Sequence, residues 1–170
     1  MRQVHPRIAR GFSLIDVVVA TIVISIALTA LLVSIGSNTR VNDAGWKITQ
    51  ASFLAQEIRE WTLALPFSDP DPGDAGNPPG PDGSSPQVFV DDLDDLMNVT
   101  YSPPRDGRGV AINELAGWSQ TITLTWRDPD DLPTVVAPGT TDVIHVSVEV
   151  AYRGHSVLTT GWLVTRRTDE

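Results

Sequence analysis

Residues 17–35 read VVVATIVISIALTALLVSI, and this apolar stretch decides how the chain folds and where it lies. No charged residue occurs from Val17 to Thr39. A helix rises about 1.5 Å per residue, so about 20 apolar residues cross the hydrocarbon core of a bilayer. Arg2, Arg7 and Arg10 precede the stretch and an acidic region follows it. These features predict a single membrane-spanning helix with its amino terminus in the cytoplasm.

Two simpler explanations of the apolar stretch are a secretory signal peptide and a plain membrane anchor. The stretch is longer than the usual apolar region of a signal peptide, which has about 7–15 residues. No small-residue cleavage site follows it, since residues 34–41 read SIGSNTRV. A plain anchor does not explain why the carboxylate of Asp16 stands at the start of the stretch, where a charge is costly.

The composition of the 170 residues excludes several classes of protein. The absence of cysteine excludes disulfides, thiolate nucleophiles, zinc ribbons and iron–sulfur clusters, and three histidines are too few and scattered for a metal cage. A formal net charge of −9 argues against a nucleic-acid binder, which needs a concentrated basic surface. No group of residues forms a recognisable catalytic motif, so we do not expect an enzyme.

A short motif joins the basic leader to the apolar stretch. Residues 11–16 read GFSLID. With its context, this segment closely resembles the class III signal of type IV pilins and type II secretion pseudopilins, whose usual form is GFTLIE before an apolar helix. The resemblance implies that prepilin peptidase cuts between Gly11 and Phe12 and methylates the new amino group of Phe12. It also implies that Asp16 pairs with the amino-terminal ammonium of a neighbouring subunit during assembly.

The motif departs from the family at one position. Asp16 replaces the usual glutamate, which keeps the charge and shortens its reach by one methylene. This change fits a minor, tip or priming subunit better than a bulk subunit. The resemblance implies three kinds of partner: prepilin peptidase, other pilin or pseudopilin subunits, and an inner-membrane assembly platform. It also implies a single-pass protein of the bacterial inner membrane, with a periplasmic head, that later enters a pilus or pseudopilus.

The apolar spacing predicts a long helix that ends at Pro66. No proline occurs between Gly11 and Leu65, and proline is excluded from helix interiors. Beyond the membrane stretch, apolar residues recur in steps of three and four, which indicates one buried face. This face consists of Ile48, Ala51, Leu54, Ala55, Ile58, Trp61 and Leu65.

The remaining sequence predicts an antiparallel sheet. Residues 67–87 form a loop rich in proline, glycine and aspartate. Apolar residues then alternate with polar ones in residues 118–126, 144–152 and 157–165, and Arg153-Gly154 indicates a tight hairpin between the last two runs. We therefore expect an α+β, pilin-like fold in which a long helix packs on a three- or four-stranded sheet.

These elements give an expected organisation of the chain. Residues 1–11 form a basic leader, and residues 12–37 form the half of the helix that lies in the membrane or the filament core. Residues 38–170 form the amphipathic half of the helix and the α+β head.

An acidic run in the head is a candidate calcium site, because calcium prefers hard oxygen ligands. Its members are Asp91, Asp92, Asp94 and Asp95. The spacing does not match an EF-hand and no glutamate completes the ligand set, so the sequence favours a charged turn or a short helix start over a calcium site. No other cofactor is expected.

Thr21, Ser25 and Thr29 recur every four residues and share one face of the apolar helix. They either form a packing stripe for neighbouring subunits or bond to their own backbone, and the sequence leaves both explanations open.

The leading hypothesis is a structural subunit, either a minor pilin or a pseudopilin. One alternative is a minor pilin that binds DNA during uptake, and another is a single-span anchored domain that never assembles. The DNA alternative needs a basic patch on the head. The basic residues beyond the helix are Arg105, Arg108, Arg127, Arg153, Arg166 and Arg167.

Overall fold

The computed structural model describes residues 13–69, 78–81 and 85–167. It divides the chain into two units, Met1–Ala44 and Gly45–Glu170, and helix α1 (Leu14–Ala64) belongs to both. The other described elements lie in the second unit: η1 (Asp94–Leu96), β1 (Val99–Tyr101), η2 (Asn113–Leu115), β2 (Trp118–Trp126), β3 (Val143–Tyr152) and β4 (His155–Thr165). The predicted α+β class is confirmed, and α1 ends two residues before Pro66 as expected.

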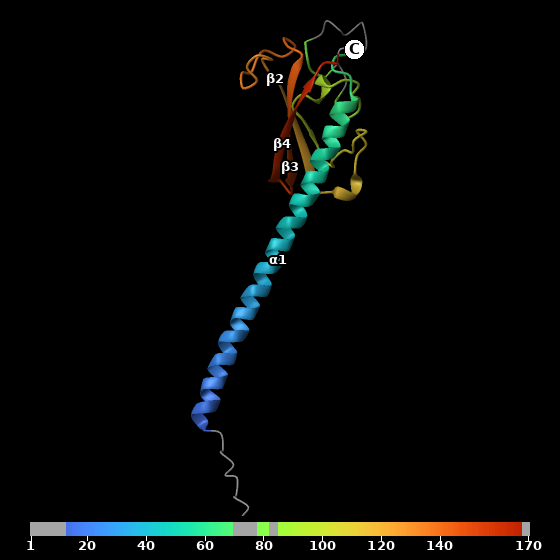
Figure 1. Ribbon diagram of the computed structural model, residues 1–170. Coiled ribbons are helices and arrows are strands. Elements are labelled where there is room, and N and C mark those ends of the chain that lie inside the picture. Colours follow the sequence, from blue (N-terminus) through green and yellow to red (C-terminus); the bar gives the residue numbers. More distant parts are fainter. Residues whose placement is uncertain (1–12, 70–77, 82–84, 168–170) are drawn as a thin grey trace, which may run out of the picture. The chain divides into compact units, whose positions relative to one another are not determined.

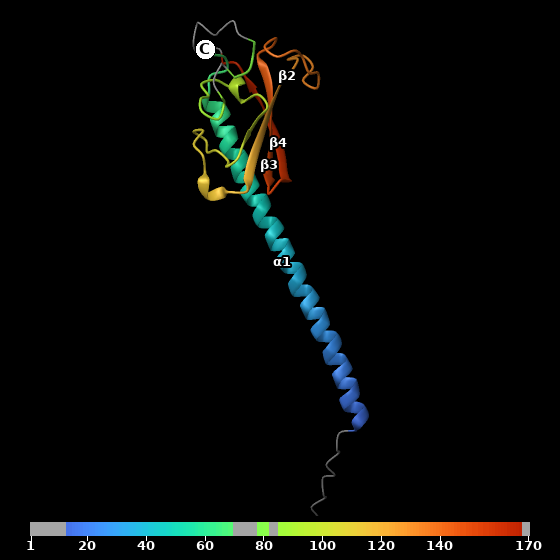
Figure 2. The same ribbon diagram turned by 180° about the vertical axis from the view of Figure 1, so that it is seen from behind.

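The four strands form one antiparallel sheet in the order β1-β2-β3-β4. Figures 1 and 2 show the carboxyl-terminal part of α1 lying along one face of this sheet. The hairpin between β3 and β4 turns at Arg153 and Gly154, whose φ angles are 51° and 79°. Two positive φ angles in a two-residue turn match the twist of the flanking strands. The predicted hairpin is therefore confirmed.

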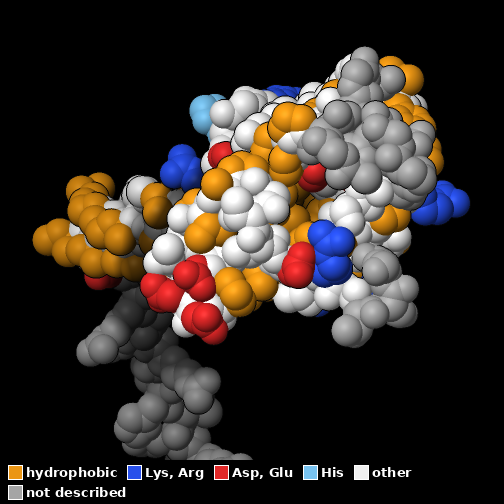
Figure 3. Space-filling view, turned by 90° about the horizontal axis from the view of Figure 1, so that it is seen from above, with side chains coloured by type: hydrophobic (Ala, Val, Ile, Leu, Met, Phe, Trp, Pro, Cys, Tyr) orange, Lys and Arg blue, Asp and Glu red, His pale blue; other side chains and the backbone are white. Residues whose placement is uncertain are grey.

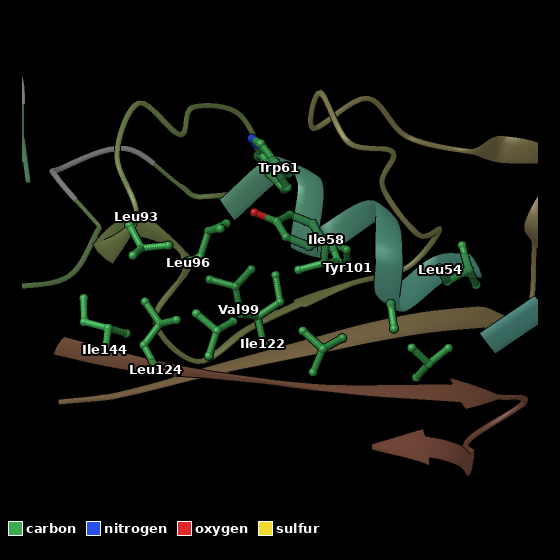
Figure 4. Close-up of a cluster of buried hydrophobic side chains, with 14 of the residues drawn as sticks. Leu54, Ile58, Trp61, Leu93, Leu96, Val99, Tyr101, Ile122, Leu124 and Ile144 are labelled. Atoms are coloured by element: carbon green, nitrogen blue, oxygen red, sulfur yellow. The ribbon is translucent and has the colours of Figure 1, made fainter. Parts of the chain in front are cut away.

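The core lies between α1 and the sheet. Every second residue of β2, from Trp118 to Trp126, is buried, as the alternation predicted. Figure 4 shows side chains of α1 and of the sheet pointing toward one another, including Leu54, Ile58, Tyr101 and Ile122. The helix contributes Ala51, Leu54, Ala55, Ile58 and Trp61 to the buried set, and β3 contributes Ile144, Val146, Val148 and Val150.

The prediction for one residue of the helical stripe is wrong. Ile48 is 53% exposed. The face that meets the sheet begins instead at Trp46, whose ring contacts Trp118 and Tyr152 with centroid distances of 5.9 and 6.2 Å. Ile48 is two residues from Trp46, which is about 200° around a helix of 3.6 residues per turn. Its side chain therefore points away from this aromatic contact.

A buried amide ties the helix to the sheet and to the connection before β2. Gln120 is fully buried, and its Nε2 donates to the carbonyl of Leu54 at 2.8 Å. The same Nε2 donates to the carbonyl of Arg105 at 3.1 Å, and Oε1 accepts from the amide of Arg105 at 2.7 Å. Burial of this amide costs little because its donor and acceptor groups are bonded.

Substitution Gln120→Leu is expected to lower the free energy of unfolding by about 2–3 kcal/mol, because the half-buried amide of Arg105 loses its acceptor and the buried donor of Gln120 to Leu54 is removed. The measurement is urea unfolding of the full chain in detergent, followed by tryptophan fluorescence. All five tryptophans lie in the second unit, so the signal reports on that unit alone. Ser119→Ala, on the opposite face of β2, is the control and should change the free energy by less than about 0.5 kcal/mol. Equal effects of the two substitutions would refute the role of the amide.

Candidate functional site

The first unit presents an apolar surface that nothing in the described chain covers. Every side chain from residue 13 to residue 36 is exposed. Soluble proteins rarely expose a continuous apolar surface of this extent. By length and composition this helix is able to cross a membrane, and none of its most apolar window is buried. The exposed large side chains are Leu14, Ile15, Val17, Val18, Val19, Ile22, Val23, Ile24, Ile26, Leu28, Leu31, Leu32, Val33 and Ile35.

Asp16 lies in the first turn of α1 and bonds to the start of its own helix. The amide of Ser13 donates to Asp16 Oδ2 at 3.1 Å, and the Ser13 carbonyl accepts from the amides of Asp16 and Val17. A carboxylate that accepts a hydrogen bond from the backbone amide three residues earlier provides a partner for an amide that has none within the helix. The spacing of Ser13 and Asp16 signals this role, which the family resemblance alone did not suggest. The predicted cleavage residues, Gly11 and Phe12, lie outside the described residues.

The hydroxyl groups within the apolar stretch are bonded inside the helix. Thr21 donates to the carbonyl of Val17 at 2.7 Å, and Ser25 and Thr29 each donate to the carbonyl four residues earlier at 2.8 Å. These bonds match the second of the two explanations for their spacing, namely bonding to the backbone. The stretch can therefore enter an apolar environment without leaving these hydroxyl donors unpaired.

The acidic run of the head forms the start of the short helix η1. Asp92 Oδ1 accepts from the amides of Asp94 and Asp95 at 2.9 and 3.1 Å, and Asp95 Oδ2 accepts from the amide of Asp91 at 3.1 Å. This geometry is the short helix start that the sequence offered as an alternative to calcium. Within the described ranges, no group of three or more histidine or carboxylate side chains is arranged to hold a metal ion. Calcium binding by this run stays a prediction.

Asp92 is the most unusual carboxyl group of this run. It is 1% exposed, and its Oδ2 is buried without a hydrogen-bond partner. Burial, followed by the neighbouring carboxyl group of Asp94, raises the pKa of Asp92 to about 7. A buried carboxyl group without a cation favours its neutral form, because ionisation in a poorly solvated site is costly. No pattern in the sequence predicts this burial, since aspartate is usually exposed.

The two described histidines of the head lie apart. His145 is half-buried in β3 on the face away from α1, and it lies against Gly161 of β4, where a Cβ atom would come within 2.6 Å of His145 Nε2. Burial, followed by the charge of Arg127, lowers the pKa of His145. His155 is exposed at the start of β4, opposite Tyr152. The fold therefore does not bring these histidines together into one site.

Basic side chains do not gather on the face of the molecule that Figure 3 shows. The blue Lys and Arg side chains are separated from one another there, and red acidic side chains lie between them.

A scan against protein-family models and searches of curated proteins and solved structures found no match to this chain.

The raised pKa of Asp92 predicts how stability depends on pH. Asp92 binds its proton more tightly in the folded chain than its ordinary pKa of 3.8 allows in the unfolded chain. The contribution of Asp92 to the free energy of unfolding is therefore fully present below pH 3.8 and is lost as the pH rises through about 7. Asp92→Asn keeps an oxygen for the two amides and cannot ionise. Between pH 4 and pH 8, the free energy of unfolding of the Asp92→Asn variant should therefore fall less than that of the natural chain.

The measurement is urea unfolding of the full chain in detergent at several pH values, followed by tryptophan fluorescence. Asp130→Asn, at an exposed position of the loop between β2 and β3, is the matched control and should keep the natural pH dependence. Parallel curves for the natural chain and Asp92→Asn would contradict the assignment.

Proposed function

We propose that this chain is a minor pilin or pseudopilin. Prepilin peptidase cuts it between Gly11 and Phe12 and methylates Phe12, and the product assembles into a type IV pilus or a type II secretion pseudopilus. The observation that carries the proposal is the motif GFSLID, whose last three residues begin a helix with an apolar surface that is exposed on all sides. The same helix continues onto an antiparallel sheet, which is the architecture expected from the resemblance.

The apolar half of α1 supplies the free energy for membrane retention and for assembly. Removing one large aliphatic side chain from water contributes about 1.5–3 kcal/mol, so the whole stretch contributes on the order of tens of kcal/mol. This sum keeps the subunit out of water after the leader is removed. Transfer from lipid into a bundle of similar helices exchanges one apolar environment for another, so specific contacts decide whether assembly occurs.

Asp16 is the proposed specific contact. In the intact chain its carboxylate accepts a hydrogen bond from the amide of Ser13. Cleavage creates a new ammonium group at Phe12, next to this turn in the sequence. An ammonium and a carboxylate offset each other's cost of leaving water when they pair in an apolar bundle. Asp16 of one subunit would then meet the ammonium of the next subunit and set their register.

The cleavage prediction is tested by incubating the full chain with a prepilin peptidase in membranes. The expected product lacks residues 1–11 and begins at methylated Phe12, as read by intact mass and amino-terminal fragment ions. Gly11→Val should stay uncut, because glycine allows the backbone to approach the peptidase closely. An uncut natural chain, under conditions where a known pilin is processed, would refute the proposal.

A pair of substitutions separates the charge of Asp16 from its helix-capping bond. Asp16→Asn keeps an oxygen that can accept the Ser13 amide and removes the charge, whereas Asp16→Ala removes both. If the charge pairs with a neighbouring ammonium, both variants should lose crosslinking to other subunits in the membrane. If Asp16 acts only as a cap, Asp16→Asn should crosslink like the natural chain, and this result would contradict the assigned role.

A further inference from the structure

The last strand of the sheet offers an open edge. β4 pairs only with β3, and it has eleven residues. No charged residue and no proline occurs from His155 to Thr165, although such residues usually protect exposed edges from pairing with other chains. In the described part of the chain, no backbone hydrogen bond outside the ladder with β3 reaches these residues. The outer donors and acceptors of β4 are therefore available to another strand.

A groove of about 350 Å³ runs beside this edge, between α1 and β4. Leu158, Thr160 and Trp162 of β4 pair with buried residues of β3, so they lie on the face of the sheet that α1 covers. The Trp162 indole donates to Thr62 Oγ1 at 3.2 Å, which fixes its ring against the helix. The groove is lined by Ser52, Ala55, Gln56, Arg59, Leu158, Thr160, Gly161 and Trp162.

Arg59 gives the groove a distinct charge. Its side chain is exposed, and it makes no hydrogen bond or ion pair with the residues that the structure describes. Every other described arginine of the second unit has a hydrogen bond, an ion pair or a ring contact; these are Arg105, Arg108, Arg127, Arg153, Arg166 and Arg167. Arg59 is thus the one arginine there without such a contact. A guanidinium group without such a contact can bind a carboxylate with two parallel hydrogen bonds.

We propose that an extended segment of a partner protein adds to the edge of β4 and places an acidic side chain against Arg59. Main-chain hydrogen bonds to an exposed strand supply affinity, and a pocket that receives alternate side chains supplies specificity. Side chains of the added strand that point toward α1 would continue the row formed by Leu158, Thr160 and Trp162. The groove would hold these alternate residues.

The position of the groove indicates a side-chain carboxylate rather than a chain terminus. The lining residues of β4, from Leu158 to Trp162, occupy the middle of the strand. Three residues of β4 remain on each side, so a paired strand extends past the groove in both directions. This inference rests on the second unit alone. It does not depend on cleavage at Gly11 or on filament assembly, so either proposal can fail without the other.

The test uses the full chain in nanodiscs with one copy per disc, and labelled eleven-residue peptides of alternating threonine and valine. Both peptide ends are capped, and the central residue is aspartate, asparagine or lysine. We expect fluorescence anisotropy to show binding of the aspartate peptide, about tenfold weaker binding of the asparagine peptide and weaker binding still of the lysine peptide. Methylation of alternate peptide nitrogens should abolish binding, since it removes the donors that pair with β4.

Arg59→Gln should remove the preference for aspartate over asparagine. Arg153→Gln, at the exposed hairpin, is the matched control and should leave the preference unchanged. Equal affinity for the three peptides, binding that survives methylation, or a preference that survives Arg59→Gln would each overturn the proposal. Binding only to a peptide with a free carboxyl terminus would also overturn it, because the carboxylate would then come from a chain end.

Discussion

The apolar surface of α1 from Leu14 to Ile35 is the constraint on which the first unit depends. No described residue covers it, and its side chains would cost on the order of tens of kcal/mol if left in water. The hydroxyls of Thr21, Ser25 and Thr29 bond within the helix, so they do not oppose transfer into an apolar environment. A bilayer meets this requirement for one copy, and a bundle of similar helices meets it for many copies.

In the second unit, the other half of the same helix packs against the sheet. Its sheet has one apolar face, and α1 covers this face with Leu54, Ile58 and their neighbours. The chain has no cysteine, so no disulfide can hold the unit together. Packing and the Gln120 hydrogen bonds join the helix to the sheet instead. The edge of β4 and the groove beside it remain open, and they give this unit a surface for recognition.

The sequence predicts features that depend on neighbours along the chain. The alternation from Trp118 to Trp126, the hairpin at Arg153-Gly154 and the end of α1 before Pro66 are all local, and all are confirmed. β1 was missed because three residues are too few to show a period. The burial of Asp92 and the groove between Arg59 and Trp162 were also missed, because they join residues that are brought together only by tertiary packing.

Cysteine labelling can show whether the apolar half of α1 lies in a membrane, because the natural chain has no cysteine. Ile26→Cys places one thiol in the middle of the stretch, and Thr49→Cys places one at an exposed position of the second unit. A water-soluble maleimide should label the cysteine at position 49 in intact membranes and should label that at position 26 only after the membranes are dissolved and the chain is denatured. Equal labelling of the two positions in intact membranes would mean that the apolar half of α1 does not lie in a membrane.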